Sequence, residues 1–299
     1  MSNVKFKGII PALVSPLNED GTVREKVLRK LLNWHLGKGC NGFYICGTTG
    51  EGVVMKPEAR KVMVEITVDA VKGKGFVIDH IGAIDLRTAM NLARHASDTG
   101  VDAISSVPPF FYKYGQKEIM QYYQALSDSS DVPMLIYSLS SIGDSISKLE
   151  MVERIMKIKN MIGLKWTNYN FFEMGKIKSI NDGNINVLVG NDGTLLAGLV
   201  MRADGGIGLT YNVMPKIYIE LYRSFISGNI KRAQDAQFKV NKVIDIMLRY
   251  DAFTAVKDIL EMIGFTVGYY TLPIKRFTKL EQESFRDELK KINFEKEYL

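Results

Sequence analysis

The sequence predicts a (β/α)8 TIM barrel followed by a C-terminal helical extension, and three observations lead to this prediction. Eight short apolar runs of β-strand character recur at regular intervals between residues 8 and 208. Stretches with the periodicity of amphipathic helices separate these runs. After residue 228 the strand patterns stop and only helical patterns remain. Strands that alternate with helices of about 10 to 15 residues are typical of a parallel sheet.

The order of these runs along the chain fits eight βα units. We expect the strands at 8–15, 42–46, 76–82, 102–107, 134–137, 162–165, 186–190 and 204–208. We expect the intervening helices at 23–37, 57–71, 86–98, 118–128, 148–158, 171–180 and 194–201, and an eighth that begins near Val213. Eight such units within roughly 220 residues are what a TIM barrel requires. A doubly wound sheet is the main alternative, but it would usually place a glycine-rich phosphate turn where this chain has S15-P-L-N18.

The last part of the chain shows helical periodicity alone, at 231–247, 252–263 and 280–292. The connection to the barrel is too short for a flexible hinge. We therefore expect the barrel to occupy residues 1–228, and residues 229–299 to form a helical extension packed on it rather than a second independent domain.

Composition excludes several classes of function. The chain has 299 residues, of which 46% are hydrophobic, so it can bury a substantial core. Its net charge of +6 comes from Lys and Arg residues that are spread out, which indicates a solvated surface and argues against nucleic acid as a partner. No apolar run approaches the ~18 residues that span a membrane, and the N-terminus lacks a signal-peptide pattern. These features predict a soluble, cytoplasmic protein without a membrane partner.

The residues that usually hold metal ions are few in this sequence. Cys40 and Cys46 are its two cysteines, and they form neither a disulfide framework nor a metal quartet. His35, His80 and His95 lack the spacing of metal ligands, so we interpret them as structural or surface residues. No metal site is expected.

Polar residues and glycines gather where the predicted strands end, which is where TIM barrels carry their active sites. The second strand ends in G47-T-T-G-E51, the fifth in Tyr137, and the sixth in Lys165 followed by Thr167. The seventh leads into G190-N-D-G193 and the eighth into G205-G-I-G-L-T-Y-N212.

Together these residues favour one kind of chemistry. A lysine in a partly apolar pocket has a lowered pKa, and its neutral amine can attack a ketone to form a Schiff base. A neighbouring phenol can relay protons, and the G-T-T-G loop offers backbone N–H groups and hydroxyls to a carboxylate. Each of these features, taken alone, has a purely structural interpretation. Lys165 could be a side chain that extends its charged end to solvent, Tyr137 could be a core residue, and the G-T-T-G loop could be only a tight turn. We interpret the glycines of the eighth strand as permitting close backbone contact, with phosphate binding as the alternative.

The chain resembles the Schiff-base-forming pyruvate aldolases, the family that includes N-acetylneuraminate lyase and dihydrodipicolinate synthase. The resemblance rests on G8-I-I-P-A-L-V-S-P16, G47-T-T-G-E51, Tyr137, G163-L-K165 and A203-D-G-G-I-G-L-T-Y-N212. The aromatic residue and Thr167 that follow Lys165, and the segment N241-K-V-I-D245, are similar to the lyase branch. The synthase branch has an arginine just after its tyrosine, whereas here the next arginine after Tyr137 is Arg154.

The resemblance implies roles for individual residues. The catalytic residues would be Lys165, Tyr137 and Thr48: Lys165 would form the imine and Tyr137 would relay the proton. Thr48 and Thr49 would hold the carboxylate of pyruvate. Hydroxyls of the sugar-derived chain would meet Thr167 and Asp192, and the backbone of Gly190 and Gly208 would line the pocket.

The chain departs from the lyase pattern at four places. Gly193 stands where the lyases carry a glutamate, and Leu209 stands where they carry a serine. Phe110 and Phe111 replace the family's pair of tyrosines, one of which serves the neighbouring subunit, with Tyr112 as an offset substitute. The usual Y-N-x-P turn has become Y137-S-L-S140, which changes positions Ser138 to Ser140.

We therefore expect an enzyme that needs no metal and no organic cofactor and acts on a small 2-keto acid. The resemblance implies cleavage of N-acetylneuraminate to pyruvate and N-acetylmannosamine, and it implies a homotetramer. Two alternatives stay open. One is a 2-keto-3-deoxy sugar acid aldolase or a dihydrodipicolinate synthase-like enzyme, and the other is a weakly active paralogue that binds pyruvate or a sugar acid.

Overall fold

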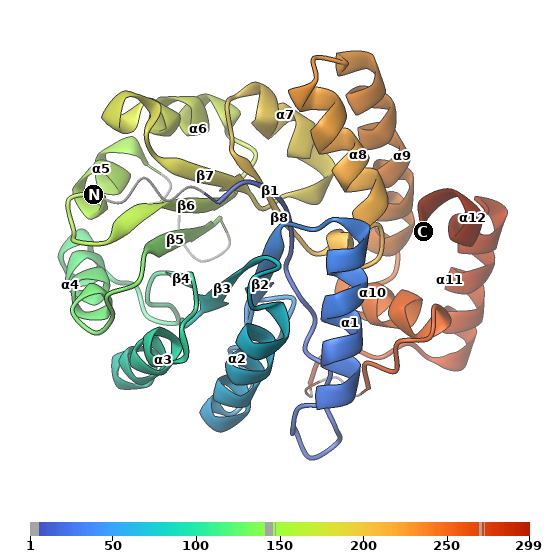
Figure 1. The fold of residues 1–299 in the computed structure, drawn as a ribbon, viewed down its shortest axis with the longest axis horizontal. Helices are drawn as coiled ribbons and strands as arrows, with labels where there is room; N and C mark the ends of the chain where they lie inside the picture. Colours follow the sequence, from blue (N-terminus) through green and yellow to red (C-terminus); the bar gives the residue numbers. More distant parts are fainter. Residues whose placement is uncertain (1–5, 141–145, 147, 269–270, 272) are drawn as a thin grey trace.

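Eight parallel strands surround a common axis in the computed structural model, which describes residues 6–140, 146, 148–268, 271 and 273–299. The hydrogen-bonded order is β1-β8-β7-β6-β5-β4-β3-β2, with helices outside the ring (Figure 1). The strands are β1 (Gly8–Pro11), β2 (Gly42–Ile45), β3 (Phe76–His80), β4 (Ala103–Ser106), β5 (Met134–Leu139), β6 (Met161–Thr167), β7 (Asn186–Val189) and β8 (Gly205–Gly208). Each strand coincides with a predicted run, and none extends past its run by more than two residues. The largest difference is at β1, which ends four residues before the predicted run does.

The ring closes between β1 and β2 by isolated contacts instead of a full ladder. Ala12 and Tyr44 form a single parallel bridge. The Leu13 N–H donates to the Tyr44 carbonyl at 2.9 Å, and the Asn41 N–H donates to the Ile9 carbonyl at 3.0 Å. The predicted (β/α)8 TIM barrel is therefore confirmed.

The helices of the barrel follow their strands as predicted. They are α1 (Glu25–Lys38), α2 (Pro57–Val71), α3 (Leu86–Thr99), α4 (Gln116–Ser127), α5 (Leu149–Ile155), α6 (Phe171–Lys178), α7 (Leu195–Val200) and α8 (Pro215–Ile226). Local signals fix several ends: the Asp85 side chain caps α3 by accepting from the Thr88 N–H, and Gly39 and Gly100 end α1 and α3 with φ of 99° and 88°. Short 3-10 helices lie at η2 (Ile180–Gly183), η3 (Asp192–Thr194) and η4 (Thr210–Asn212).

Alternation along the strands divides the core into two layers. Side chains that point outward pack against the helices, and Trp166 of β6 belongs to this larger layer. Side chains that point inward form a smaller cluster, which includes Ile10, Tyr44, Tyr137 and Leu188. The glycines of β8 make room inside this arrangement, since a Cβ on Gly205 would collide with the backbone of Gly8. The glycine at this position of β8 therefore permits close contact between the backbones of β8 and β1.

The extension consists of α9 (Ile230–Leu248), α10 (Ala252–Met262), α11 (Lys279–Lys291) and α12 (Phe294–Tyr298). The predicted helical extension is confirmed, with α9 packed along α8 and α11 beside α9 (Figure 1). The short helix α12 was not predicted. Phe294 and Tyr298 stack there with ring centres 5.4 Å apart. The boundary at residue 228 stays a prediction.

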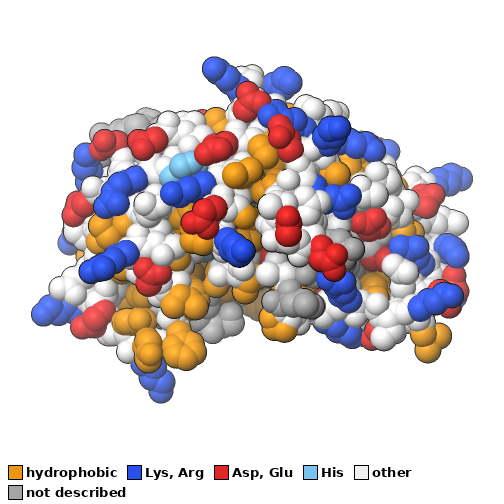
Figure 2. All heavy atoms as spheres, turned by 90° about the horizontal axis from the view of Figure 1, so that it is seen from below, with side chains coloured by type: hydrophobic (Ala, Val, Ile, Leu, Met, Phe, Trp, Pro, Cys, Tyr) orange, Lys and Arg blue, Asp and Glu red, His pale blue; other side chains and the backbone are white. Residues whose placement is uncertain are grey.

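The surface carries charges of both signs. Figure 2 shows Lys and Arg side chains interspersed with Asp and Glu side chains across the face in view, without one extended block of either sign. Within the described part of the chain, no helix is both long enough and apolar enough to cross a membrane.

Candidate active site

Lys165 lies near the carboxyl end of β6 with its side chain inside the barrel. It pairs in register with Tyr137 on β5 and with Leu188 on β7, and only 4% of its surface is exposed. Its Nζ lies 4.0 Å from the ring centre of Tyr137 and 4.4 Å from that of Tyr44. The amine is therefore enclosed by two aromatic faces at the end of the barrel where TIM-barrel active sites form.

Tyr137 connects this lysine to the G-T-T-G-E loop. Its phenol oxygen lies 3.3 Å from the Thr48 hydroxyl oxygen, and either group can be the donor. Burial alone would raise the pKa of the Tyr137 phenol, but the Lys165 ammonium and the Thr48 hydroxyl favour the phenolate. These effects outweigh burial, so the pKa of Tyr137 lies below 10. A phenol of this kind can donate or accept a proton beside the amine.

The loop after β2 is a tight turn that carries Thr48 and Thr49. The Glu51 N–H donates to the Thr48 carbonyl at 3.1 Å, and the Gly52 N–H donates to the Gly47 carbonyl at 3.1 Å. Thr48 is exposed to solvent and its hydroxyl contacts the Tyr137 phenol, whereas Thr49 in the same turn is buried. Thr48 and Tyr137 are thus brought together as predicted, while a carboxylate held by Thr49 stays a prediction.

Thr167 and Gly190 also lie next to the lysine. A Cβ on Gly190 would overlap the Thr167 hydroxyl and would stand 3.2 Å from the Lys165 Cε. Gly190 therefore keeps open the space around the lysine. The Thr167 hydroxyl oxygen is buried and has no aligned hydrogen-bond partner among the described residues, although it lies close enough to help lower the pKa of Tyr137. Buried polar groups normally have partners, so this hydroxyl is available to a ligand.

Asp192 lies in η3, after β7, and leans against β8. One of its carboxylate oxygens accepts from both the Thr210 N–H and the Thr210 hydroxyl, each at 2.6 Å. The other oxygen would stand 2.6 Å from a Cβ on Gly208, so only a glycine leaves room there. Burial raises the pKa of Asp192 despite the Thr210 hydrogen bonds and the nearby Lys165. The expectation that Asp192 binds substrate hydroxyls stays a prediction, and one of its oxygens is already engaged.

Sequence reasoning missed Tyr44 and His80 as neighbours of this site. The His80 ring packs edge-on against Tyr137 with centres 5.7 Å apart. Its Nδ1 lies 3.1 Å from the Cys46 carbonyl oxygen, and its Nε2 accepts from the Val107 N–H at 3.4 Å. Burial lowers the pKa of His80 to about 3, so the ring is neutral at pH 7. His80 ends β3, and its place at a strand end was the signal that could have identified it.

The remaining histidines match their predicted structural and surface roles. His35 is buried in α1, where its Nδ1 lies 2.9 Å from the Leu31 carbonyl oxygen. His95 lies at the surface with its Nε2 2.9 Å from Glu65. Within the described residues, no group of three or more His, Cys, Asp or Glu side chains is arranged to hold a metal ion.

The positions that depart from the lyase pattern surround the mouth of the barrel. Phe111 is 83% exposed and has a φ of 84°. The centre of its ring lies 5.0 Å from the centre of the exposed Tyr112 ring. Gly193 has open space, since the nearest atom to a Cβ there would be the Asn241 Oδ1 at 3.5 Å. Leu209 is half-buried against the core. Ser138 extends β5, and the Ser140 N–H donates to the Thr167 carbonyl at 3.4 Å.

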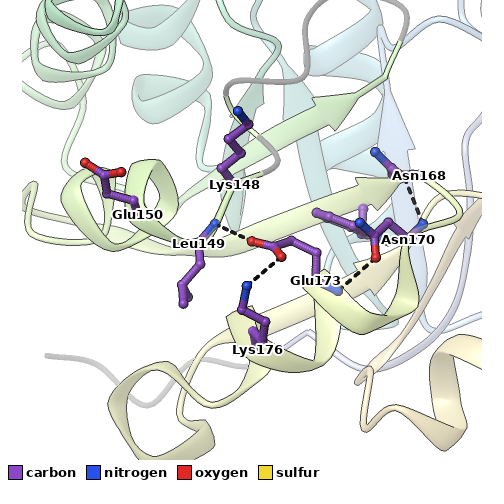
Figure 3. A pocket seen from close by; sticks show the side chains of 8 residues that line it. Lys148, Leu149, Glu150, Asn168, Asn170, Glu173 and Lys176 are labelled. Atoms are coloured by element: carbon purple, nitrogen blue, oxygen red, sulfur yellow. Dashed lines mark hydrogen bonds and ion pairs between the residues drawn. The ribbon is translucent and has the colours of Figure 1, made fainter.

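A separate pocket of about 690 Å³ lies outside the barrel wall (Figure 3). Trp166 lines it, and since successive strand residues face opposite sides, this pocket is on the reverse of β6 from Lys165. Its polar groups largely bind one another: Glu173 accepts from Lys176 at 2.8 Å and from the Leu149 N–H at 2.9 Å (Figure 3). The groups suited to catalysis lie inside the barrel instead.

A TIM barrel with an enclosed lysine, an adjacent phenol and a threonine-bearing loop at its carboxyl end defines a lyase of the aldolase type. The sequence matches the Dihydrodipicolinate synthetase family over residues 5–292. The chain therefore belongs to this family of Schiff-base-forming pyruvate aldolases, as the resemblance predicted.

Two sequence relatives carry the name of the lyase branch. N-acetylneuraminate lyase from Rhizobium meliloti is 29% identical over 284 residues, which cover 95% of this chain and 94% of that protein. The enzyme of the same name from Salmonella paratyphi B is 31% identical and covers 85% of this chain and 86% of its own length.

Similar solved structures come from both branches of the family. Proteus mirabilis N-acetylneuraminate lyase superposes with a TM-score of 0.92 at 28% identity, covering 97% of this chain and 100% of that one. Dihydrodipicolinate synthase from Aquifex aeolicus superposes with a TM-score of 0.90 at 26% identity, and the match covers 96% of this chain and 98% of that one. A Ruminococcus gnavus sialic acid aldolase described as a catalytic lysine mutant superposes with a TM-score of 0.93 at 26% identity, and the match covers 98% of each chain.

Proposed function

We propose that the protein is a class I aldolase that cleaves a 2-keto sugar acid, N-acetylneuraminate or a close relative, to pyruvate and an aldehyde such as N-acetylmannosamine. The observation that carries this proposal is the position of Lys165, enclosed by the Tyr44 and Tyr137 rings inside the barrel. Its relatives named N-acetylneuraminate lyase support the choice of substrate.

In the proposed reaction, the neutral Lys165 amine adds to the keto carbon of the substrate. The former keto oxygen then leaves as water with a proton from the Tyr137 phenol, which gives a protonated imine and the Tyr137 phenolate. Tyr137 accepts the proton of the hydroxyl two carbons away, so that the carbon–carbon bond breaks and the aldehyde departs. The electron pair of that bond moves into the imine and forms an enamine. The enamine takes up a proton, and water then releases pyruvate and restores the lysine.

The surrounding residues would bind and orient the substrate. Thr48 and Thr49 would hold the carboxylate with the backbone N–H groups of their turn. The Thr167 hydroxyl and the Asp192 carboxylate would contact substrate hydroxyls. Gly190 and Gly208 would line the pocket, because side chains at these positions would overlap Thr167 and approach Asp192.

A second candidate is an aldolase for a shorter keto acid, such as a 2-keto-3-deoxy sugar acid, or a dihydrodipicolinate synthase-like enzyme. Two features favour a less hydroxylated substrate: Thr210 already engages one Asp192 oxygen, and Leu209 is apolar where the lyases carry a serine. A weakly active paralogue is the third candidate, motivated by Phe111 in place of a tyrosine. In that case Phe111→Tyr should increase turnover, and no increase would show that the phenol is not limiting.

The mechanism is tested by reducing the protein with borohydride in the presence of pyruvate. We expect a covalent adduct that maps to Lys165 by peptide mass spectrometry, and an adduct elsewhere or none would refute the mechanism. Pyruvate release from N-acetylneuraminate, compared by kcat/KM with release from shorter keto acids, then separates the candidates. The proposal also includes a cytoplasmic homotetramer that uses neither metal nor organic cofactor, which rests on the family resemblance.

A further inference from the structure

The C-terminal extension makes a buried ionic contact with the loop that follows β2. Lys257 of α10 forms an ion pair with Glu51, the last residue of the G-T-T-G-E motif. The two side chains are 3% and 4% exposed. A charge buried to this extent needs a partner, because neither group has access to bulk water. The pair therefore links two parts of the chain that are far apart in the sequence.

Both carboxylate oxygens of Glu51 have partners. While one oxygen meets Lys257, the other accepts from the Thr271 N–H at 2.7 Å. The backbone of Glu51 has φ of 57°, a left-handed conformation that residues with a side chain adopt only when their surroundings hold them. Cys46, at the other end of the loop, has φ of 54°. Both ends of this loop are thus in a conformation that needs support.

The conformation of Glu51 sets the position of Thr48. The Glu51 N–H donates to the Thr48 carbonyl at 3.1 Å, and this hydrogen bond closes the turn. The Thr48 hydroxyl in turn lies 3.3 Å from the Tyr137 phenol. A continuous set of contacts therefore runs from α10 through the loop to the phenol beside Lys165.

We propose that Lys257 is a positioning residue, which holds the carboxylate-binding loop of the active site from the C-terminal extension through Glu51. This inference rests on the proposed function, because it takes the loop to be the binding site for the carboxylate of pyruvate. It gives the extension a role in substrate binding in addition to packing. The role is distinct from catalysis, since Lys257 acts through Glu51 and the loop.

The barrel offers a matched control at its other end. Lys178 and Asp204 form a second buried ion pair at 2.5 Å, with side chains 6% and 11% exposed. Asp204 also accepts from the Val187 N–H at 2.9 Å, next to the amino ends of β7 and β8. Removing either lysine should destabilise the fold by a similar mechanism, but only Lys257 is connected to the loop.

The test compares Lys257→Met with Lys178→Met in three measurements: thermal unfolding, the pyruvate concentration that gives half-maximal borohydride trapping, and kcat. We expect both variants to unfold at lower temperature. The half-maximal pyruvate concentration should rise by about tenfold or more in Lys257→Met alone, since a small displacement of a binding group has effects of this size. Lys257→Arg, which keeps the charge, should recover most of the affinity for pyruvate.

Several outcomes would overturn the proposal. An unchanged half-maximal pyruvate concentration in Lys257→Met, or an equal rise in both methionine variants, would reduce Lys257 to a structural role. If Lys257→Met does not fold, the double variant Glu51→Gln/Lys257→Met removes both charges, and unaltered pyruvate affinity in it would refute the inference. The absence of any adduct in the unaltered protein is a different result, because it refutes the proposed function itself.

Discussion

Lys165 and Tyr137 are register partners on β6 and β5, and the lysine Nζ lies 4.0 Å from the centre of the phenol ring. Because neighbouring residues in register on parallel strands point to the same side of the sheet, both side chains enter the barrel together. The pair thus places an amine and a proton-relay group at one point. A shift of either strand by one residue would turn its side chain out of the barrel and separate the two groups.

Replacement of the lysine should abolish turnover. Lys165→Met keeps an apolar side chain of similar length but cannot form an imine, so we expect kcat to fall by at least about three orders of magnitude. The borohydride adduct should disappear with it. Circular dichroism would check that the variant is folded. Retained turnover in a folded variant would contradict the role of Lys165.

Ionisation of Tyr137 should occur below pH 10 and should depend on Thr48. The Thr48 hydroxyl stabilises the phenolate, so Thr48→Val should raise the pKa of Tyr137. The titration is read as the difference in phenolate absorbance between the parent protein and its Tyr137→Phe variant. A difference titration that does not move in the Thr48→Val background would show that the 3.3 Å contact is not a hydrogen bond. Tyr137→Phe should itself reduce kcat by about 10²- to 10⁴-fold, the usual range for loss of a proton-transfer group.

A methyl group at Gly190 should block the site without unfolding the barrel. Gly190→Ala places a Cβ on the Thr167 hydroxyl and 3.2 Å from the Lys165 Cε, so imine formation should be lost or strongly reduced. Gly37→Ala is the control, because a Cβ there meets no atom within 4 Å and the residue lies in α1. The control should keep its activity and gain roughly 0.5–1 kcal/mol in free energy of unfolding. Normal trapping in Gly190→Ala would contradict the packing around the lysine.

Stability should fall as the solution becomes acidic, because two histidines are buried in the neutral form. Burial lowers the pKa of His35 to about 4 and that of His80 to about 3, while the unfolded chain protonates near 6.5. Below pH 6.5 the unfolded state therefore binds more protons, and each histidine removes up to about 1.4 kcal/mol of unfolding free energy per pH unit. Burial raises the pKa of Asp79 to about 6, which opposes this loss between pH 6 and pH 4.

Urea unfolding at a series of pH values from 7 to 4.5 measures this effect. His35→Gln, which replaces the histidine remote from Lys165, should make the dependence on pH less steep by about one proton. An equal slope in the variant and the parent protein would show that His35 does not contribute to the loss of stability.

Substrate preference should respond to two of the positions that depart from the lyase pattern, Gly193 and Leu209. Gly193→Glu has room, with the nearest heavy atom to its Cβ 3.5 Å away, and Leu209→Ser restores a hydroxyl. Because a site that binds substrate hydroxyls discriminates strongly, the double variant should raise kcat/KM for N-acetylneuraminate about tenfold or more relative to a shorter keto acid. If the ratio stays constant, these positions do not select the substrate.

The local sequence determined the strands and most of the helices. Short continuous apolar runs predicted all eight strands, because strands of a barrel are buried on both faces. Stretches of period 3.6 predicted, in the described part of the chain, eleven of the twelve α-helices, because each such helix buries one side. The missed helix α12 has five residues, too few for a periodic pattern. The motif residues were also readable, since strand ends of a parallel barrel share one face.

Only the tertiary structure showed what surrounds those residues. Tyr44 and His80 come from β2 and β3, yet they enclose Lys165 and Tyr137 of β6 and β5. Their participation depends on the curvature that closes the sheet, which no local pattern encodes. The sequence by itself therefore determined the barrel and the chemical groups at its carboxyl end. The contact between Glu51 and Lys257 was decided by how the extension packs on the barrel, because burial and pairing of charges depend on residues distant in the chain.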